Sequence, residues 1–395
     1  MRERFMVEGQ VACKMFVASE QYPYHTYNMP DNAYMSGIVL GALSMKYAVT
    51  KDPADRALAS EVLDGLHLLS TVSGKRGLLS RAAWPKDVPQ PDDGQWHDSP
   101  DGKHVWRGDV SSDQMDGAMY GYAIAYDLMA DEAQKKLIAQ DVSDLVGTLL
   151  DTGLMIVDID GKPTRFGKYM PQYVRLIEPM NALLLLQLLK IADHVTGDER
   201  FGREYRRLAV DEKYAETAVN ARHMLGGVNF SDDVLLFLAY YPLLKYETDP
   251  ELRALYVKSL ERVWEGVGRY PGANAQANPY YGFVANEFLK DESGVAPGID
   301  TLRWFPLDMK WNRDTIAGYE KKFTFTFDPA PQSPPTESGK AVPVDRREKS
   351  WSAWVMNPFK TAGDRTEDVG IEYNGHDYLM AYWLGRYLGL ITPEM

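Results

Sequence analysis

The chain has 395 residues, a formal net charge of −13 and an aromatic content of 12%, including 24 tyrosines and 9 tryptophans. This length allows one large domain or two ordinary ones. The negative charge argues against nucleic acid and anionic membrane surfaces as partners, because binding to either depends on clustered lysine and arginine. The high aromatic content is typical of grooves that bind ring-shaped ligands, of which sugars are one kind.

Cysteine and histidine usage argues against a metal site and gives no sign of a cofactor. Cys13 is the only cysteine and the seven histidines are scattered, which excludes a thiolate zinc site and an internal disulfide. The searches for phosphate-binding, dinucleotide, zinc-protease, serine-hydrolase and EF-hand motifs are negative. The start "MRERFMVEGQVACKMF" lacks the apolar run of a secretory signal. We therefore expect a cytoplasmic protein if Met1 is the native start, and a periplasmic or secreted one if a leader was removed.

Along the chain, the predicted helices come in pairs joined by similar turns. In each turn an apolar helix end is followed by a polar link and by an aspartate that begins a charged amphipathic helix. Such an aspartate accepts hydrogen bonds from the free backbone N–H groups at a helix start. We therefore predict helix-capping roles for Asp52, Asp131, Asp198 and Asp249.

The first helix of each pair is apolar on all sides, whereas the second carries charge on one face. The first set should therefore be buried, with the second set around it. Six such pairs predict an all-α fold, an (α/α)6 toroid, provided that the last helix pairs with an outer helix from the N-terminal part or from the 300s. The inner helices are predicted to begin near Asp31, Ser112, Pro179, Ser231, Asn278 and Gly375.

We predict a single domain over 1–395, with 1–29 as an N-terminal extension and long loops on one rim. The loop 84–109 and the region 320–366 are rich in proline, glycine and aspartate, and loops of this length are commonly functional or mobile. A small β-hairpin is predicted around Asp160 and Gly161, because Asp-Gly favours the positive φ angles of a tight turn.

The stretch "WRGDVSSDQMDG" is the first candidate for a catalytic site. Asp113 and Asp116 fall on one side of an inner helix, and Asp109 comes just before it. Paired carboxyl groups suit glycosidic-bond chemistry, in which one donates a proton and another activates water or stabilises positive charge. The alternative is that Ser111 and Gln114 form a capping box and that the helix dipole alone favours Asp113 there.

The second candidate is "NPFKTAGDRTEDVGIEYNGHDYLMAYW", Asn357 to Trp383, which places acidic residues immediately before or at the start of the last inner helix. Inner helices of a toroid run parallel, so this start should share the rim of Asp113. We predict Asp113 as the general acid/base and Asp109 or Glu372 as its partner. The predicted substrate contacts are His104, Trp106, Arg107, Asp116, Trp304 and His376. The alternative is that Asn374 or Asp377 only caps the helix.

The helix pairs, the buried inner helices and the loop before "SSDQMDG" resemble the six-hairpin glycosidase-like superfamily over about Pro30 to Ile391. Unsaturated glucuronyl hydrolases of that superfamily use aspartates at inner-helix entrances as acid/base, a role that Asp113 matches. The resemblance implies a glycoside hydrolase acting without a cofactor on an oligosaccharide or polysaccharide that contains uronic acid.

Two alternatives stay open: a polysaccharide lyase that recruits His223, Tyr280 and Arg303, and a toroid that binds glycans without turning them over. The sequence gives no indication of the oligomeric state.

Overall fold

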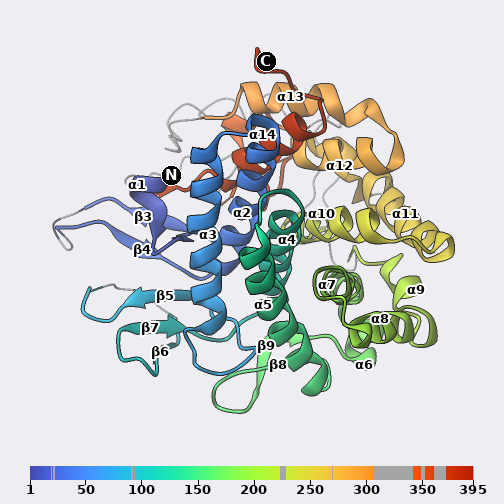
Figure 1. The fold of residues 1–395 in the computed structure, drawn as a ribbon. Helices are drawn as coiled ribbons and strands as arrows, with labels where there is room; N and C mark the ends of the chain where they lie inside the picture. Colours follow the sequence, from blue (N-terminus) through green and yellow to red (C-terminus); the bar gives the residue numbers. More distant parts are fainter. Residues whose placement is uncertain are drawn as a thin grey trace.

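The computed structural model describes residues 1–18, 20, 23–89, 92, 94–222, 228–268, 270–306, 341–347, 352–359 and 371–394. Six long helices form an inner ring. Consecutive helices of this ring contact one another, and the last contacts the first, so that the ring is closed (Figure 1). They are α2 (Asn32–Thr50), α4 (Ser112–Leu128), α7 (Met180–Thr196), α10 (Phe230–Tyr246), α12 (Pro279–Leu289) and α14 (His376–Tyr387).

The inner ring confirms the predicted toroid, and each inner helix begins within one residue of the predicted start. The outer layer consists of α3 (Pro53–Thr71), α5 (Glu132–Asp151), α8 (Glu199–Arg206) with the short π-helix η1 (Arg207–Asp211) and α9 (Tyr214–Ala218), α11 (Pro250–Glu265) and α13 (Val295–Arg303). Among the described residues no outer helix pairs with α14, which packs against α2 and α12. The short helices α1 (Arg2–Phe5) and α6 (Pro171–Leu176) complete the set.

The predicted caps are confirmed. The side chains of Asp52, Asp131, Asp198 and Asp249 each accept a hydrogen bond from a backbone N–H in the first turn of the following helix. Each satisfies donors that a helix start leaves free.

Small antiparallel sheets decorate the ring. β3 (Lys14–Phe16) lies between β4 (Thr26–Asn28) and β12 (Ile371–Tyr373), and β7 (His104–Arg107) lies between β5 (Ala82–Pro85) and β6 (Trp96–Asp98). The pairs are β1 (Met6–Val7) with β2 (Gln10–Val11), β8 (Met155–Val157) with β9 (Pro163–Lys168), and β10 (Gly266–Val267) with β11 (Tyr270–Pro271). The β8–β9 pair confirms the predicted hairpin, and Gly161 in its turn has a φ of 80°.

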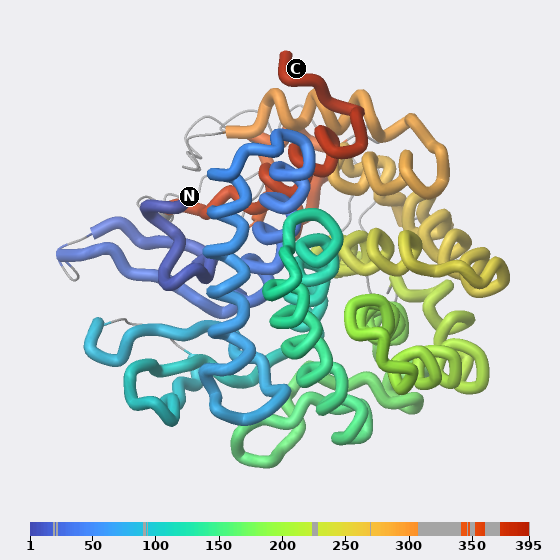
Figure 2. The backbone as a smooth tube through the Cα atoms, in the orientation of Figure 1, coloured from blue at the N-terminus to red at the C-terminus, as the bar shows by residue number. Residues whose placement is uncertain are grey.

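The β12–β3 pairing joins the two ends of the chain. Figure 2 shows the C-terminal segment returning to lie beside the N-terminal one. The sheet residues 14–16 thus belong to the predicted extension 1–29, while the predicted loop region 320–366 contributes 341–347 and 352–359 to the described structure. No helix in the described residues is long and apolar enough to cross a membrane.

The main hydrophobic core contains buried side chains from all six inner helices. The contact between α2 and α4 is made by backbone rather than by large side chains. A Cβ atom on Gly37 would collide with the carbonyl of Gly117, and one on Gly121 would collide with the carbonyl of Gly37. These glycines therefore set how closely the two helices approach, and α2 and α4 carry candidate carboxylates at their starts.

Candidate active site

The starts of the inner helices converge at one end of the ring. A cavity of about 50 Å³ is lined by Asp31 and Tyr34 of the α2 end, Asp113 of α4, and Ser231 and Leu235 of α10.

Residues at the starts of the other inner helices interact electrostatically with this group of residues. Burial raises the pKa of Asp232 on α10, and the negative charge of Glu178, which precedes α7, raises it further. Asp377 of α14 contributes to raising the pKa of Tyr34, and Tyr34 contributes to raising the pKa of Tyr281 on α12. We call this end of the ring the acidic mouth.

Asp31 is the residue immediately before α2, and sequence analysis noted it only as a helix start. Gln114 Nε2 and Arg81 Nη1 donate to the same oxygen, Oδ1, at 2.5 and 3.2 Å. Burial and the charge of Asp113 raise the pKa of Asp31 to about 6, although the Arg81 guanidinium opposes this rise. Its position in the sequence could have indicated Asp31 as a site residue, because it stands at the start of an inner helix, as Asp113 does.

Asp113, the favoured candidate, lies in the first turn of α4 and is partly exposed. Ser112 Oγ donates to its Oδ1 at 3.2 Å. Burial raises its pKa, against the hydrogen bond from Ser112 and the charge of Arg81. Backbone N–H of Ser111 donates to Gln114 Oε1 at 2.7 Å, so the predicted link between these two residues is present beside the carboxylate. The capping role of this pair and a chemical role of Asp113 are therefore compatible.

Asp109 and Glu372, the predicted partners of Asp113, are not brought to the cavity. Asp109 has a φ of 54°, and its carboxylate accepts a hydrogen bond from the backbone N–H of Arg165 on β9 at 3.1 Å. Glu372 lies on β12, where its carboxylate pairs with Arg4 at 2.6 Å. Both carboxylates hold loops or termini in place, because each already binds a donor of a distant segment.

Three residues predicted to contact the substrate lie on β7, the central strand of a small sheet. Trp106 is 1% exposed and packs on His97, with 4.7 Å between ring centroids. Arg107 donates to Asp92 at 2.6 Å. His104 Nε2 lies 3.2 Å from the carboxylate of Glu8.

The remaining predicted contacts differ in exposure. Trp304, at the end of α13, is 64% exposed. His376 is buried behind Tyr34, with ring centroids 6.5 Å apart, and burial lowers its pKa. Its Nδ1 lies 2.7 Å from Asn374 Oδ1, so the predicted cap residue also orients the imidazole. Asp116 is fully buried below Asp113 and does not line the cavity.

A buried basic residue beside the segment that precedes α12 was missed by sequence analysis. Arg347 is buried and donates through Nε to Val342 O at 2.7 Å and through Nη2 to Gln276 O at 2.8 Å. Among the described residues no carboxylate pairs with it. Burial lowers its pKa to about 10, while nearby Tyr281 raises it. By contrast, Arg222 is neutralised by Asp233 through two hydrogen bonds of 2.8 and 2.7 Å.

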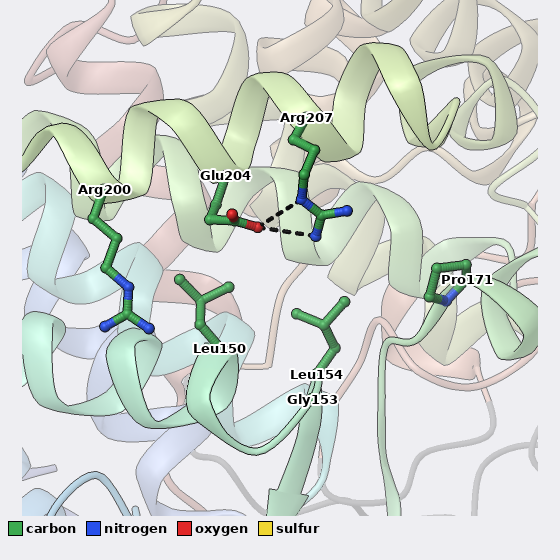
Figure 3. Close-up of a pocket in the computed structure, with 7 residues that line it drawn as sticks. All are labelled: Leu150, Gly153, Leu154, Pro171, Arg200, Glu204 and Arg207. Atoms are coloured by element: carbon green, nitrogen blue, oxygen red, sulfur yellow. Dashed lines mark hydrogen bonds and ion pairs between the residues drawn. The ribbon is translucent and has the colours of Figure 1, made fainter.

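A larger groove of about 370 Å³ lies on the outside of the ring, between α5, α6 and the α8–η1 segment. Figure 3 shows Arg200, Glu204 and Arg207 along one wall and Leu150 and Leu154 opposite. Its charges are already paired, because Arg207 binds Glu204 at 2.9 Å and Arg200 binds Asp151 at 2.6 Å. The mouth, with its desolvated carboxyl groups, is therefore the stronger candidate despite its smaller cavity.

Other ligand types find less support in the described residues. No group of three or more histidine, cysteine, aspartate or glutamate side chains among them could hold a metal ion. His223, which the lyase alternative recruits, lies outside the described residues, and Tyr280 of the same alternative is fully buried.

The closed ring of inner helices, with acidic residues gathered at their starts, defines a toroid protein of the α/α type. No protein-family model matches the chain, and no curated protein does. Solved structures similar to it include an unsaturated glucuronyl hydrolase specific for heparin (12% identity, TM-score 0.47, covering 97% of this chain and 92% of that one). Two others are a sugar epimerase from a ruminal bacterium (12%, 0.49, 98% and 95%) and cellobiose 2-epimerase from Bacillus thermoamylovorans B4167 (12%, 0.44, 91% and 88%).

At this identity and TM-score, the likeness assigns neither a family nor a reaction to the chain. The function has to be inferred from the chemistry of the acidic mouth.

Proposed function

We propose that the protein is a glycoside hydrolase that acts on an acidic oligosaccharide by carboxylate acid/base catalysis. The observation that carries the proposal is that Asp31 and Asp113, from neighbouring inner helices, line the same cavity. Both are partly exposed, and burial raises the pKa of both. Two carboxyl groups in different protonation states are what glycosidic-bond hydrolysis requires.

Asp31 suits the general acid. Both of its hydrogen-bond donors reach Oδ1, which leaves Oδ2 to carry the proton. The charge of Asp113 helps to keep that proton in place, because an ionised neighbour raises a carboxyl pKa. Asp31 then protonates the leaving oxygen, while Asp113 activates water or stabilises the positive charge that develops on the sugar.

The cavity is small for a sugar ring. Its volume of about 50 Å³ is enough for a few water molecules. It therefore suits the reacting oxygen atoms between the two carboxyl groups, with the sugar rings outside it. Tyr34 lines the same cavity but is buried, so it bounds the space around the reacting atoms.

The environment of Arg347 supports the proposal that the substrate is an acidic sugar. A buried guanidinium without a carboxylate partner is costly, and a carboxylate on the ligand would compensate it with charge-assisted hydrogen bonds. Tyr281 links Arg347 to Tyr34, because both affect the pKa of Tyr281. The negative side chains of the acidic mouth would repel the carboxylate of an acidic sugar. The Arg347 guanidinium would therefore also orient the sugar.

The test is a panel of oligosaccharides that contain uronic acid, their unsaturated forms and matched neutral oligosaccharides. Reducing ends and the ultraviolet absorbance of the uronyl double bond are followed together. We expect new reducing ends without new absorbance, or the loss of existing absorbance for an unsaturated substrate, and slower turnover of neutral sugars. A rise in both signals would establish a lyase instead.

The Asp113→Asn variant should reduce kcat by about 10²-fold to 10⁴-fold, because it removes acid/base chemistry but keeps the shape of the side chain. Asp109→Asn is the matched control: its amide oxygen can still accept from Arg165, so kcat should stay within about threefold of wild type. An Asp113→Asn protein that keeps its rate would contradict the assignment. Binding without turnover by the wild-type protein would favour the glycan-binding alternative.

A further inference from the structure

Asp116 is a buried carboxyl group that the proposed acid/base pair does not use. It follows Asp113 by three residues and lies on the same side of α4, one turn deeper in the ring. It is 0% exposed, and neither of its carboxylate oxygens has a hydrogen-bond partner among the described residues. Buried polar atoms in proteins are nearly always hydrogen-bonded, so this exception requires a physical explanation.

Among the described residues, the surroundings of Asp116 are polar but provide no positive charge. The Gln187 amide of α7 lies beside it and is also buried without a hydrogen-bond partner in the described structure. The neighbouring titratable groups are one carboxyl group, Asp113, and phenols from α2, α4, the segment before α6, and α12. These phenols are Tyr34, Tyr120, Tyr169 and Tyr280, and burial raises the pKa of each.

A negative charge on Asp116 would be desolvated, unpaired and next to a second carboxyl group. Proteins avoid such a charge by keeping the group neutral. Burial raises the pKa of Asp116 well above its ordinary value and the charge of Asp113 raises it further, while the neighbouring Gln187 amide opposes the rise without forming a well-aligned hydrogen bond. A protonated carboxyl group is uncharged and retains a donor and an acceptor, which suits this polar but uncharged environment.

We propose that Asp116 is a positioning residue that stays protonated throughout the reaction, so that the negative charge of the two α4 carboxyl groups remains on Asp113 at the cavity. This role rests on the proposed function, since it concerns the carboxylate that acts on the sugar. Two ionised carboxyl groups one turn apart in a buried site would repel each other. A neutral Asp116 removes that repulsion and lets Asp113 ionise at the pH at which it is needed.

The first test needs no substrate. Infrared difference spectra between the wild-type protein and Asp116→Asn at pH 7 should show the carbonyl band of a protonated carboxylic acid. Asp109→Asn is the control, because it removes a carboxylate that binds a backbone N–H, and it should not remove that band. Absence of the band from the wild-type minus Asp116→Asn spectrum would mean that Asp116 is ionised, and would overturn the proposal whatever the substrate proves to be.

The second test uses the pH profile of kcat/KM. Asparagine is neutral, as protonated aspartate is, so in Asp116→Asn the limb of the profile in which activity rises as Asp113 ionises should stay at the wild-type pH. If Asp116 were ionised, its removal would move that limb to lower pH. A loss of kcat of more than about tenfold at unchanged KM would show that Asp116 transfers a proton itself, and would also overturn the proposal.

If Asp116→Asn does not fold, the band can be followed in the Asp232→Asn protein, which lacks another carboxyl group whose pKa burial raises strongly. A protonated-acid band that persists well above the pKa of Asp31, which is about 6, supports the proposal. Its complete loss there contradicts it.

Discussion

At the residue scale, what distinguishes the aspartates of this chain is their surroundings. Asp52 and Asp131 cap helices at the surface, where their oxygens bind backbone N–H groups. Asp31 and Asp113 also stand at helix starts, but burial raises their pKa values. The same residue type at the same helical position is therefore a cap in one place and a candidate acid in another, because desolvation penalises the charged form only where water is excluded.

The pKa of Asp31 leads to a prediction about pH. If Asp31 is the general acid, activity should fall as the pH rises through about 6, where Asp31 loses its proton. Arg81→Gln removes a positive charge that opposes the rise in the pKa of Asp31. The fall in activity should therefore occur at higher pH in this variant. Carbon-13 NMR titration of the aspartate carboxyl groups measures the same change without a substrate. An unchanged Asp31 pKa in Arg81→Gln would refute the assigned cause.

The shifted pKa of Asp31 also makes the stability of the folded protein depend on pH. Its folded-state pKa lies above the ordinary value of 3.8, so the folded protein binds this proton more tightly than the unfolded chain does. The stability that it contributes is fully present below about pH 4 and is lost as the pH rises through about 6.

At the element scale, the glycine contact between α2 and α4 determines how closely the two proposed catalytic helices approach. Gly37→Ala should lower the free energy of unfolding by about 1–3 kcal/mol, because the new methyl group meets the backbone of Gly117 and cannot be accommodated by a side-chain rotation. It should also lower kcat, since α2 and α4 carry Asp31 and Asp113. Urea denaturation measures the first effect, and the rate on any active substrate measures the second.

The matched control is Gly147→Ala in α5. The nearest atom to its added methyl group lies 3.9 Å away, an ordinary contact. Alanine favours a helix over glycine by about 0.8–1 kcal/mol, so this variant should be as stable as the wild type or more so. Equal losses in both variants would mean that the helix contact is not what matters at Gly37.

At the scale of the whole molecule, a carboxylate near the end of α4 joins three inner helices at the end of the ring opposite the mouth. Asp127, near the end of α4, binds His194 of α7 at 2.8 Å, Lys245 of α10 at 2.7 Å and Tyr246 of α10 at 2.9 Å. Burial would raise the pKa of Asp127, but the hydrogen bonds from these three side chains outweigh it and lower the pKa to about 2. The cation at the end of α10, Lys245, is also favoured by the dipole of that helix.

Asp127→Asn should therefore lower the free energy of unfolding at pH 7 by about 1 kcal/mol after allowance for solvent screening. A lowered carboxyl pKa contributes stability that is present above about pH 4 and is lost as the pH falls toward 2. The difference between variant and wild type should shrink over that range in urea denaturation. Glu199→Gln, which breaks an exposed pair with Arg203, should have a smaller effect at every pH. A difference that does not depend on pH would contradict this account.

The sequence by itself determined the helix pairs, their caps, the hairpin at Gly161 and the division into inner and outer helices. These features depend on local properties, because apolar periodicity, a capping oxygen and a turn residue each act over a few positions. All of them could therefore be predicted from the sequence. The toroid followed from them, because apolar helices of this length have to be covered by their partners. Asp113 was proposed as a site residue in the same way, from its place at the start of an inner helix.

Only the tertiary structure decided which polar residues meet. It placed Asp31 beside Asp113, although 81 positions separate them, engaged Asp109 and Glu372 with distant donors, and buried Trp106 and Asp116. It also left Arg347 without a carboxylate partner among the described residues. Local sequence does not encode these outcomes, because desolvation and pairing depend on atoms that the ring brings together from different helices.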